Sequence, residues 1–335
     1  MTSPGMTSGD LKRRDILIRL ASACAVGLGL SYAAQTLKHG SGPGEQKSGK
    51  VFPNLGKEAS KVTHISLIGR SSQFELVKAE AGWILPQSDF YPVADDALSR
   101  FIKAMTDLRY VRTLPPPTKL DAEASQIAPL KGGDGVLISL ETKDKAQIAT
   151  LSLARRGAIT LAQLPGNEAL YEISTVDWPP LDSPKAWLDL PKFDIAAERI
   201  ATVELIRPDQ DRLDIVRRPD GGFAPVGGTS SPTITDLALI LARLEPQAVM
   251  AANKVLGAPA FSHNTSLKSG LIITLDGFEN AGQFWVKVRT DTSKAASPEE
   301  GDRWATQTKG WAYAIPPNFW TLLMAPTPAV LQASP

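Results

Sequence analysis

Histidine is the first residue type to examine, because its imidazole serves as a general acid or base and as a metal ligand near neutral pH. The chain has three, His39, His64 and His263. His39 lies in a glycine-rich stretch, His64 lies in a strand-like pattern, and His263 is expected in a turn after a helix. Because no two of them have the spacing of a motif such as H-E-x-x-H, we predict no metal ligand and no catalytic base among them.

Nucleophile and phosphate-binding motifs are the next possibilities. The serine pairs 71–72 and 230–231 lack the closing glycine of a nucleophile elbow, and both lie in expected turns. The run Gly132 to Gly135 precedes a strand-like segment and lacks a following Lys-Ser/Thr, so it does not fit a phosphate cradle. We expect this run to form a turn with positive φ, and we predict no catalytic and no cofactor-binding residue.

Carboxylates could form the catalytic pair of a glycosidase if two of them faced each other about 5 to 9.5 Å apart. Asp95-Asp96 instead favours a helix N-terminus, where negative charge is stabilised by the helix dipole. Asp209, Asp211 and Glu299-Glu300 fit solvated loops. A hydrolase that uses such scattered carboxylates is therefore only a third alternative.

Three tryptophans are candidates for core or contact positions. Trp178 and Trp320 each follow a tyrosine by seven residues, which favours equivalent core anchors over ligand platforms. Trp285 alternates outward from its apolar neighbours along the chain, so it is either an exposed partner contact or a packing residue between two units.

The elements that must position these residues form an α+β pattern. Alternating apolar residues predict strands around Ile65 and Phe74, and Gly82 to Leu85 closes a hairpin. Helical spacing predicts one amphipathic helix, and strand patterns follow it. The helix residues are Leu98, Phe101, Met105 and Leu108, and the later strands centre on residues 135–140, 151–153, 159–161 and 171–173.

The second half of the chain repeats this order. Strand patterns near Val203 and Leu213 precede a helix that Thr233 and Asp236 open in a capping-box-like spacing. Gly270 to Leu275 matches Gly135 to Leu140. The triplet Tyr171, Ile173 and Trp178 recurs with identical spacing as Tyr313, Ile315 and Trp320.

We therefore predict an α+β fold of two tandem β-β-α-β-β-β units, each a mainly antiparallel sheet with a helix packed on one face, after an N-terminal hydrophobic helix. The expected boundaries are an export signal or membrane anchor at 1–38, a flexible linker at 39–50, the first repeat at 51–176, a connector at 177–198, the second repeat at 199–325 and a C-terminal tail at 326–335.

The amino-terminal segment indicates export. Basic residues including Arg13-Arg14 and Arg19 precede or interrupt an apolar stretch, and the uninterrupted part from Leu20 to Ala34 is shorter than the roughly 20 residues of a full membrane span. Both a retained anchor through residues 16–37 and a cleaved signal remain open. In either case the positive-inside rule places the N-terminus in the cytoplasm, and the bulk of the chain is expected to be exported.

The mode of export also remains open. Arg13-Arg14 partly matches the twin-arginine motif, and Ala21 to Cys24 loosely matches a lipoprotein cleavage box. Cys24 is the single cysteine, so no intramolecular disulfide is expected. The net charge of +1, from 36 basic and 35 acidic residues, argues against nucleic acid as a partner.

Several short motifs resemble a bacterial family of unknown function, the family numbered 4340. They are Val51 to Leu55 after the membrane segment, Gly82-Trp83 at the first hairpin, Tyr91-Pro92 before the helix, Leu108 to Val111 after it, and Trp187-Leu188-Asp189 between the halves. The resemblance covers nearly all of the chain beyond residue 50. It implies an anchored envelope protein with two related halves that accompanies an ABC-transporter ATPase, its permease and a gliding-motility-type auxiliary protein.

The leading expectation is a non-enzymatic periplasmic protein, tethered to the inner membrane, that assists an ABC-type transport system through contacts with its permease or auxiliary proteins. No cofactor is expected. The alternative is a periplasmic module that binds a glycan or a lipid in a groove between the units. An apolar cleft lined from both halves would favour that alternative.

Overall fold

The computed structural model describes residues 48–114, 126–208 and 211–332. Within this part the fold is α+β, with two mainly antiparallel sheets and few helices, as the sequence predicts. The predicted export segment lies outside the described residues, as do His39, Cys24 and Asp209. No helix in the part that is described is long and apolar enough to cross a membrane.

The first sheet has nine strands in the order β4-β3-β2-β1-β6-β7-β8-β9-β5. All of its pairings for which registers are known are antiparallel. The strands are β1 His64–Ile68, β2 Gln73–Ala79, β3 Gly82–Leu85, β4 Tyr91–Pro92, β5 Tyr110–Thr113, β6 Val136–Glu141, β7 Gln147–Arg156, β8 Ile159–Gln163 and β9 Leu170–Ile173.

The second sheet has eight strands in the order β12-β11-β10-β14-β15-β16-β17-β13. Its neighbours are also antiparallel. The strands are β10 Ile200–Ile206, β11 Arg212–Arg217, β12 Phe223–Pro225, β13 Ala248–Ala251, β14 Phe261–Leu267, β15 Ile272–Asn280, β16 Gln283–Asp291 and β17 Trp311–Ala314.

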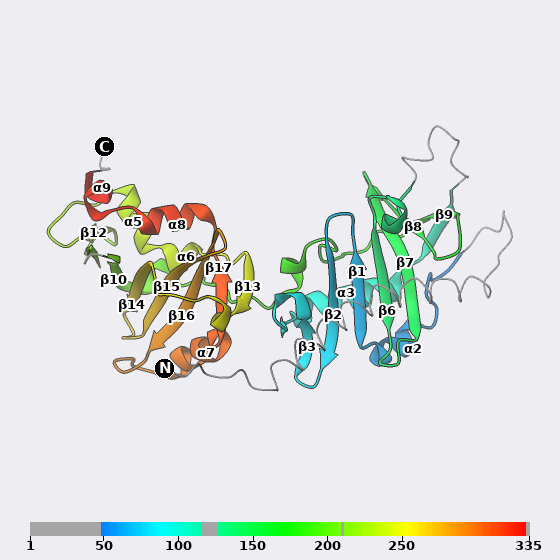
Figure 1. The fold of residues 1–335 in the computed structure, drawn as a ribbon, viewed down its shortest axis with the longest axis horizontal. Coiled ribbons are helices and arrows are strands. Elements are labelled where there is room, and N and C mark those ends of the chain that lie inside the picture. The colour runs from blue at the N-terminus through cyan, green and yellow to red at the C-terminus, as the bar shows by residue number, and fades with distance from the viewer. Residues whose placement is uncertain (1–47, 115–125, 209–210, 333–335) are drawn as a thin grey trace, which may run out of the picture. The chain divides into compact units, whose positions relative to one another are not determined.

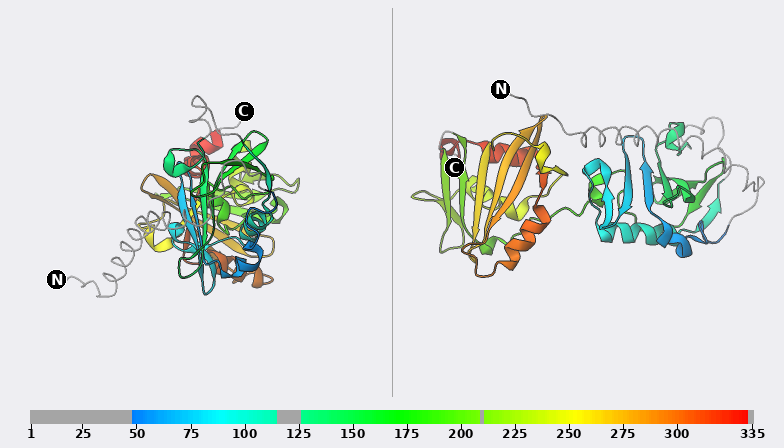
Figure 2. Two further views of the ribbon diagram at one scale, coloured as in Figure 1. Left: turned by 90° about the vertical axis from the view of Figure 1, so that its right-hand side faces the viewer. Right: turned by 60° about the horizontal axis from the view of Figure 1, so that its bottom comes forward.

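Helices cover one face of each sheet (Figure 1). In the first sheet this is α3, Asp95–Asp107, whose buried residues Ala97, Phe101, Ala104 and Met105 form a stripe with helical spacing. Figure 2 shows the same helix from another side, where it runs across the strands of the sheet. The predicted helix is therefore confirmed, and Asp95-Asp96 lies at its N-terminus as expected. The short helix α2 spans Leu55–Glu58.

The helix predicted in the second half is two short helices, α5 Pro232–Ala238 and α6 Ile240–Arg243. The predicted cap was wrong by two residues: the Ser231 hydroxyl accepts from the backbone N–H of Ile234 at 3.2 Å, and Pro232 follows at the first helical position. Three further helices are α7 Glu299–Thr308, α8 Pro317–Met324 and α9 Thr327–Gln332, the last within the predicted tail.

The predicted turn at His263 is wrong, because this residue lies in strand β14. Its inward positions are Phe261, His263, Thr265 and Leu267, so two of four buried side chains are polar and the apolar alternation is broken. The predicted match between Gly270–Leu275 and Gly135–Leu140 is also wrong, because it equates β15 with β6. The counterpart of β6 is β14: β6 pairs with β1 in the first sheet, and β14 pairs with β10 in the second.

The chain forms two compact units that do not follow the sequence halves strictly. One unit comprises the described parts of residues 1–78 and 96–184, and the other comprises residues 79–95 and the described parts of 185–335. Within the second unit, Asp89 accepts from the backbone N–H of Ala251 at 2.8 Å and pairs with Lys254. The Tyr91 hydroxyl donates to the carbonyl oxygen of Asp189 at 3.0 Å, so residues 79–95 are firmly held there.

Candidate functional site

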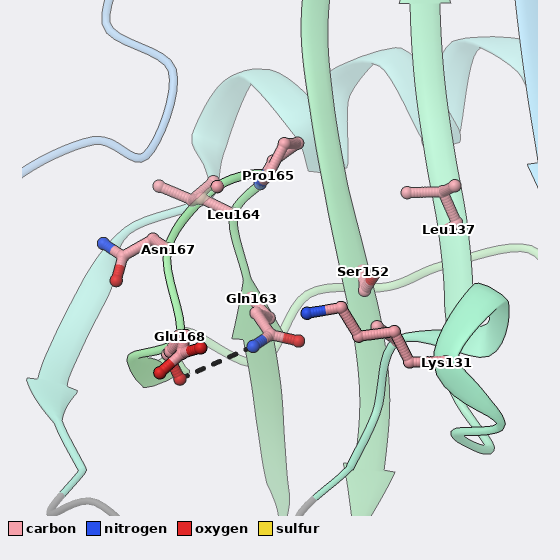
Figure 3. Close-up of a pocket in the computed structure, with 10 residues that line it drawn as sticks. Lys131, Leu137, Ser152, Gln163, Leu164, Pro165, Asn167 and Glu168 are labelled. Atoms are coloured by element: carbon pink, nitrogen blue, oxygen red, sulfur yellow. Dashed lines mark hydrogen bonds between the residues drawn. The ribbon is translucent and has the colours of Figure 1, made fainter. Parts of the chain in front are cut away.

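A small hollow lies on the outer face of the first sheet, away from α3 (Figure 3). Leu137, Ser152 and Gln163 stand next to one another on β6, β7 and β8, because strand register places them in one transverse row. Lys131 comes from the turn before β6, and residues 164–168 connect β8 to β9 and close the opposite side. The hollow measures about 160 Å³.

The wall opposite Lys131 is a turn held by one asparagine. The Asn167 side chain donates to the Tyr171 hydroxyl at 2.8 Å and accepts from the backbone N–H of Ala169 at 2.9 Å. Gly166 adopts a φ of 71°, which glycine tolerates without strain. Because both the nitrogen and the oxygen of the Asn167 amide form these hydrogen bonds, the role of this side chain is to hold the turn that forms the wall of the hollow.

The polar groups of the hollow are Ser152, Lys131, Gln163 and Glu168. Ser152 as a residue is 5 % exposed, and its hydroxyl forms no hydrogen bond with any residue that the structure describes. Gln163 makes one long contact, from its amide to the carbonyl oxygen of Glu168 at 3.5 Å. No hydrogen bond joins the Lys131 ammonium to Ser152 in this described part, so the pair lacks the contact by which a lysine base activates a serine nucleophile.

A second polar surface lies on the outer face of the second sheet. Asp214, Glu204, Asn264, Thr274 and Arg289 form one transverse row over five neighbouring strands. Thr274 donates to Asn264 at 2.8 Å, and Asn264 donates to Glu204 at 2.8 Å. We call these five residues the polar row. It borders a shallow hollow of about 470 Å³.

Arginines neutralise the carboxylates of this face. Arg212 lies 2.7 Å from Glu204 and 3.0 Å from Asp214, which face each other across β10 and β11. Arg289 donates to Asp276, and this hydrogen bond raises the pKa of the Arg289 guanidinium. The surface is thus charged but internally paired, which fixes its side chains in place.

An apolar groove of about 410 Å³ lies elsewhere in the first unit. Val136, Leu153 and the segment 175–182 line it. Trp178 is among the lining residues, and its indole N–H is buried with no hydrogen-bond partner in the described structure. Trp178 is half-buried, and its ring packs against Phe101 of α3 at 6.1 Å.

The two described histidines are held by different partners. His64 Nε2 lies 3.0 Å from a carboxylate oxygen of Glu75, and this hydrogen bond lowers the pKa of Glu75 in spite of partial burial. His263 is fully buried, and burial lowers its pKa to about 4. Its Nε2 contacts the carbonyl oxygen of Leu237 at 3.0 Å, so neutral His263 donates from Nε2.

Other predicted positions are corrected by the structure. Trp285 is not an exposed contact: it is 2 % exposed and packs with Val255, Phe278 and Ala312, because both faces of β16 are covered at that end. Glu299-Glu300 is not a solvated loop but the first turn of α7, where Glu300 pairs with Arg199. Trp320, predicted to be a core anchor, is only half-buried, and its ring stacks on that of Phe284 at 4.6 Å.

The remaining glycines and carboxylates have structural roles. Gly132 has positive φ as predicted, whereas Gly135 allows close approach of the backbone, since a Cβ there would lie 2.4 Å from the Ile127 carbonyl oxygen. Asp211 pairs with Arg207 at 3.0 Å. Among the residues that are described, no cluster of three histidine, cysteine or acidic side chains could hold a metal ion.

No protein-family model matches the chain, and no curated protein or solved structure is significantly similar to it. The resemblance to the envelope family of unknown function therefore stays a prediction based on short motifs.

Proposed function

We propose that this chain is a non-enzymatic accessory component of an ABC-type transport system, tethered to the inner membrane through residues 16–37 with its folded units in the periplasm. The observation that carries the proposal is the polar row of the second unit. Its side chains are held by hydrogen bonds and ion pairs before any partner arrives, which lowers the entropy cost of forming a polar protein contact.

The strand orders support the further proposal that the halves are two copies of one unit. We leave out β4 and number the other strands of each half in chain order. Both sheets then have the strand order 3-2-1-5-6-7-8-4. In each half the helical segment, α3 or α5-α6, follows the third strand of that numbering. The unit we propose has more strands than the predicted β-β-α-β-β-β pattern.

The partner test is site-specific photo-crosslinking in the native host. A photoreactive residue in place of Arg212, whose side chain is 57 % exposed, should crosslink to the permease or an auxiliary envelope protein. The same residue in place of Lys143, in the turn between β6 and β7, is the matched control. Deletion of the gene and of the neighbouring permease gene should also give one phenotype. Equal crosslinking at both positions, or unrelated phenotypes, contradicts the proposal.

The second candidate function is that of a periplasmic module that binds a glycan or a lipid. The apolar groove beside Trp178 favours it, because an aromatic ring with a free indole N–H suits a ligand that has both apolar and polar parts. Quenching of tryptophan fluorescence by lipid or oligosaccharide, abolished by Trp178→Phe, would support this candidate over the first.

A further inference from the structure

We propose that the hollow beside Lys131 is a binding site for a small hydroxylated carboxylate, such as a hydroxy acid or a uronic acid. This site lies in the first unit and doesn't depend on the accessory role proposed above, whose surface is in the second unit. Four observations carry the proposal: a hydroxyl that faces the hollow, an ammonium that forms no ion pair with any described residue, acceptors on the facing wall, and the size of the space.

The Ser152 hydroxyl is the first observation. Ser152 as a residue is largely buried, but its hydroxyl oxygen is not among the fully buried atoms that lack a partner, so this oxygen is accessible from the hollow. Ser152 is 5 % exposed, and it lines the hollow. A ligand hydroxyl or carboxylate placed there would supply the missing partner.

The charges of the lining define the ligand. Lys131 makes no ion pair with any described residue, and its side chain extends over the sheet in Figure 3. An ammonium in this position favours a carboxylate. Gln163 and Glu168, on the other side, offer oxygens that accept from ligand hydroxyls. A phosphate dianion is less suitable, because the Glu168 carboxylate would repel it.

The size of the hollow restricts the ligand further. A water-sized group needs roughly 10 to 15 Å³ of such space. The hollow of about 160 Å³ therefore has room for roughly 11 to 16 water-sized groups, a range that includes the roughly 13 non-hydrogen atoms of a uronic acid. Beside it on the same face of the sheet, a small apolar cluster packs over β7, β8 and β9; it consists of Ile127, Ala154, Leu161 and Leu170. The lining is thus rigid enough to select one shape.

The test uses the full-length chain purified in detergent and saturation-transfer NMR observed on the ligand. The probes are glucuronate, glucose, acetate and inorganic phosphate. Glucuronate should bind more tightly than glucose, which lacks the carboxylate, and more tightly than acetate, which lacks the hydroxyls. Stronger binding of phosphate than of glucuronate would identify a simple anion site and overturn the proposal, as would the absence of transfer to every probe.

Two variants and a control locate the binding. Lys131→Met should weaken glucuronate binding about tenfold or more, because it removes a charge-assisted hydrogen bond. Ser152→Ala should weaken binding while leaving the unliganded thermal midpoint equal or higher, a combination that a purely structural serine does not give. Lys143→Met, at an exposed lysine outside the hollow, should bind like the parent. Unchanged affinity in Lys131→Met overturns the proposal.

Discussion

Arg207 and Leu323 are joined by a hydrogen bond in which the Arg207 Nε donates to the Leu323 carbonyl oxygen at 2.7 Å. The same guanidinium donates to Asp211 at 3.0 Å and to the Thr327 hydroxyl at 3.1 Å. Burial alone would raise the pKa of Asp211, but hydrogen bonds from Thr327 and Arg207 outweigh it and lower that pKa. One arginine after β10 thus holds the end of α8 and the start of α9.

Arg207→Met should lower the free energy of unfolding by about 2 kcal/mol, since it removes a buried charged donor and leaves the Leu323 carbonyl without it. Amide exchange in residues 317–332 should accelerate more than exchange in β14. Arg243→Met, which breaks an exposed ion pair with Asp236, should cost at most about 1 kcal/mol. Equal losses in the two variants would refute this role for Arg207.

His263 should make the fold sensitive to mild acid. Its pKa is about 4 in the folded chain against 6.5 in the unfolded chain, so the unfolded state binds the proton first as the pH falls. Stability is therefore lost progressively between pH 6.5 and 4, by about 3 kcal/mol from this group. His263→Gln should remove that part of the pH dependence in urea unfolding, whereas His64→Gln should retain it. A parallel pH profile for parent and His263→Gln would contradict the assignment.

Gly277→Ala should destabilise the second sheet. Gly277 of β15 lies opposite Phe261 of β14, and an added Cβ would lie 2.1 Å from a ring carbon of Phe261. The ring has to shift within a packed core, at a cost of about 1 to 3 kcal/mol. Gly56→Ala in α2, where the nearest atom is 3.4 Å away, should be neutral or stabilising. Thermal unfolding compares the two, and a harmless Gly277→Ala would show that the ring is not fixed.

Arg212→Ala should produce a small loss of stability that depends on salt. Glu204 and Asp214 are cross-strand neighbours, and without Arg212 their like charges face each other directly. The loss should stay below about 1 kcal/mol at low salt and shrink at high salt through screening. Urea unfolding at two salt concentrations measures it. A large loss that salt does not change would mean that Arg212 has a packing role.

The sequence predicted those elements whose buried side chains are uniformly apolar. Phe101 and Met105 revealed α3, and Ile65 and Leu76 revealed the first strands, because their spacing alone identifies a buried face. The prediction fails where buried side chains are polar or where both faces of a strand are covered. The polar residue His263 interrupts the apolar alternation of β14, so the pattern predicts a turn there. For Trp285 the alternation leaves an exposed contact and a packing residue equally open, because it does not show whether both faces of a strand are covered.

The hollow beside Lys131 could not be predicted from sequence motifs. Lys131, Ser152 and Gln163 are ordinary residues on a turn and two strands, and only the antiparallel register of β6, β7 and β8 brings the strand residues together. The polar row has the same origin, since its five members are spread from Glu204 to Arg289 and meet by pairing across strands. The one local signal was polar residues in outward strand positions.

The division of the second unit between two stretches of chain has a consequence for biosynthesis. Asp89 and Lys254 are 165 residues apart in sequence, and Tyr91 and Tyr313 are 222 apart. While the polypeptide emerges from the ribosome or translocon, residues 79–95 therefore cannot form their native contacts until the later part of the chain has been synthesised. Closing so long a loop is slow, and a nascent chain that stops near residue 184 would leave this hairpin region without its native neighbours.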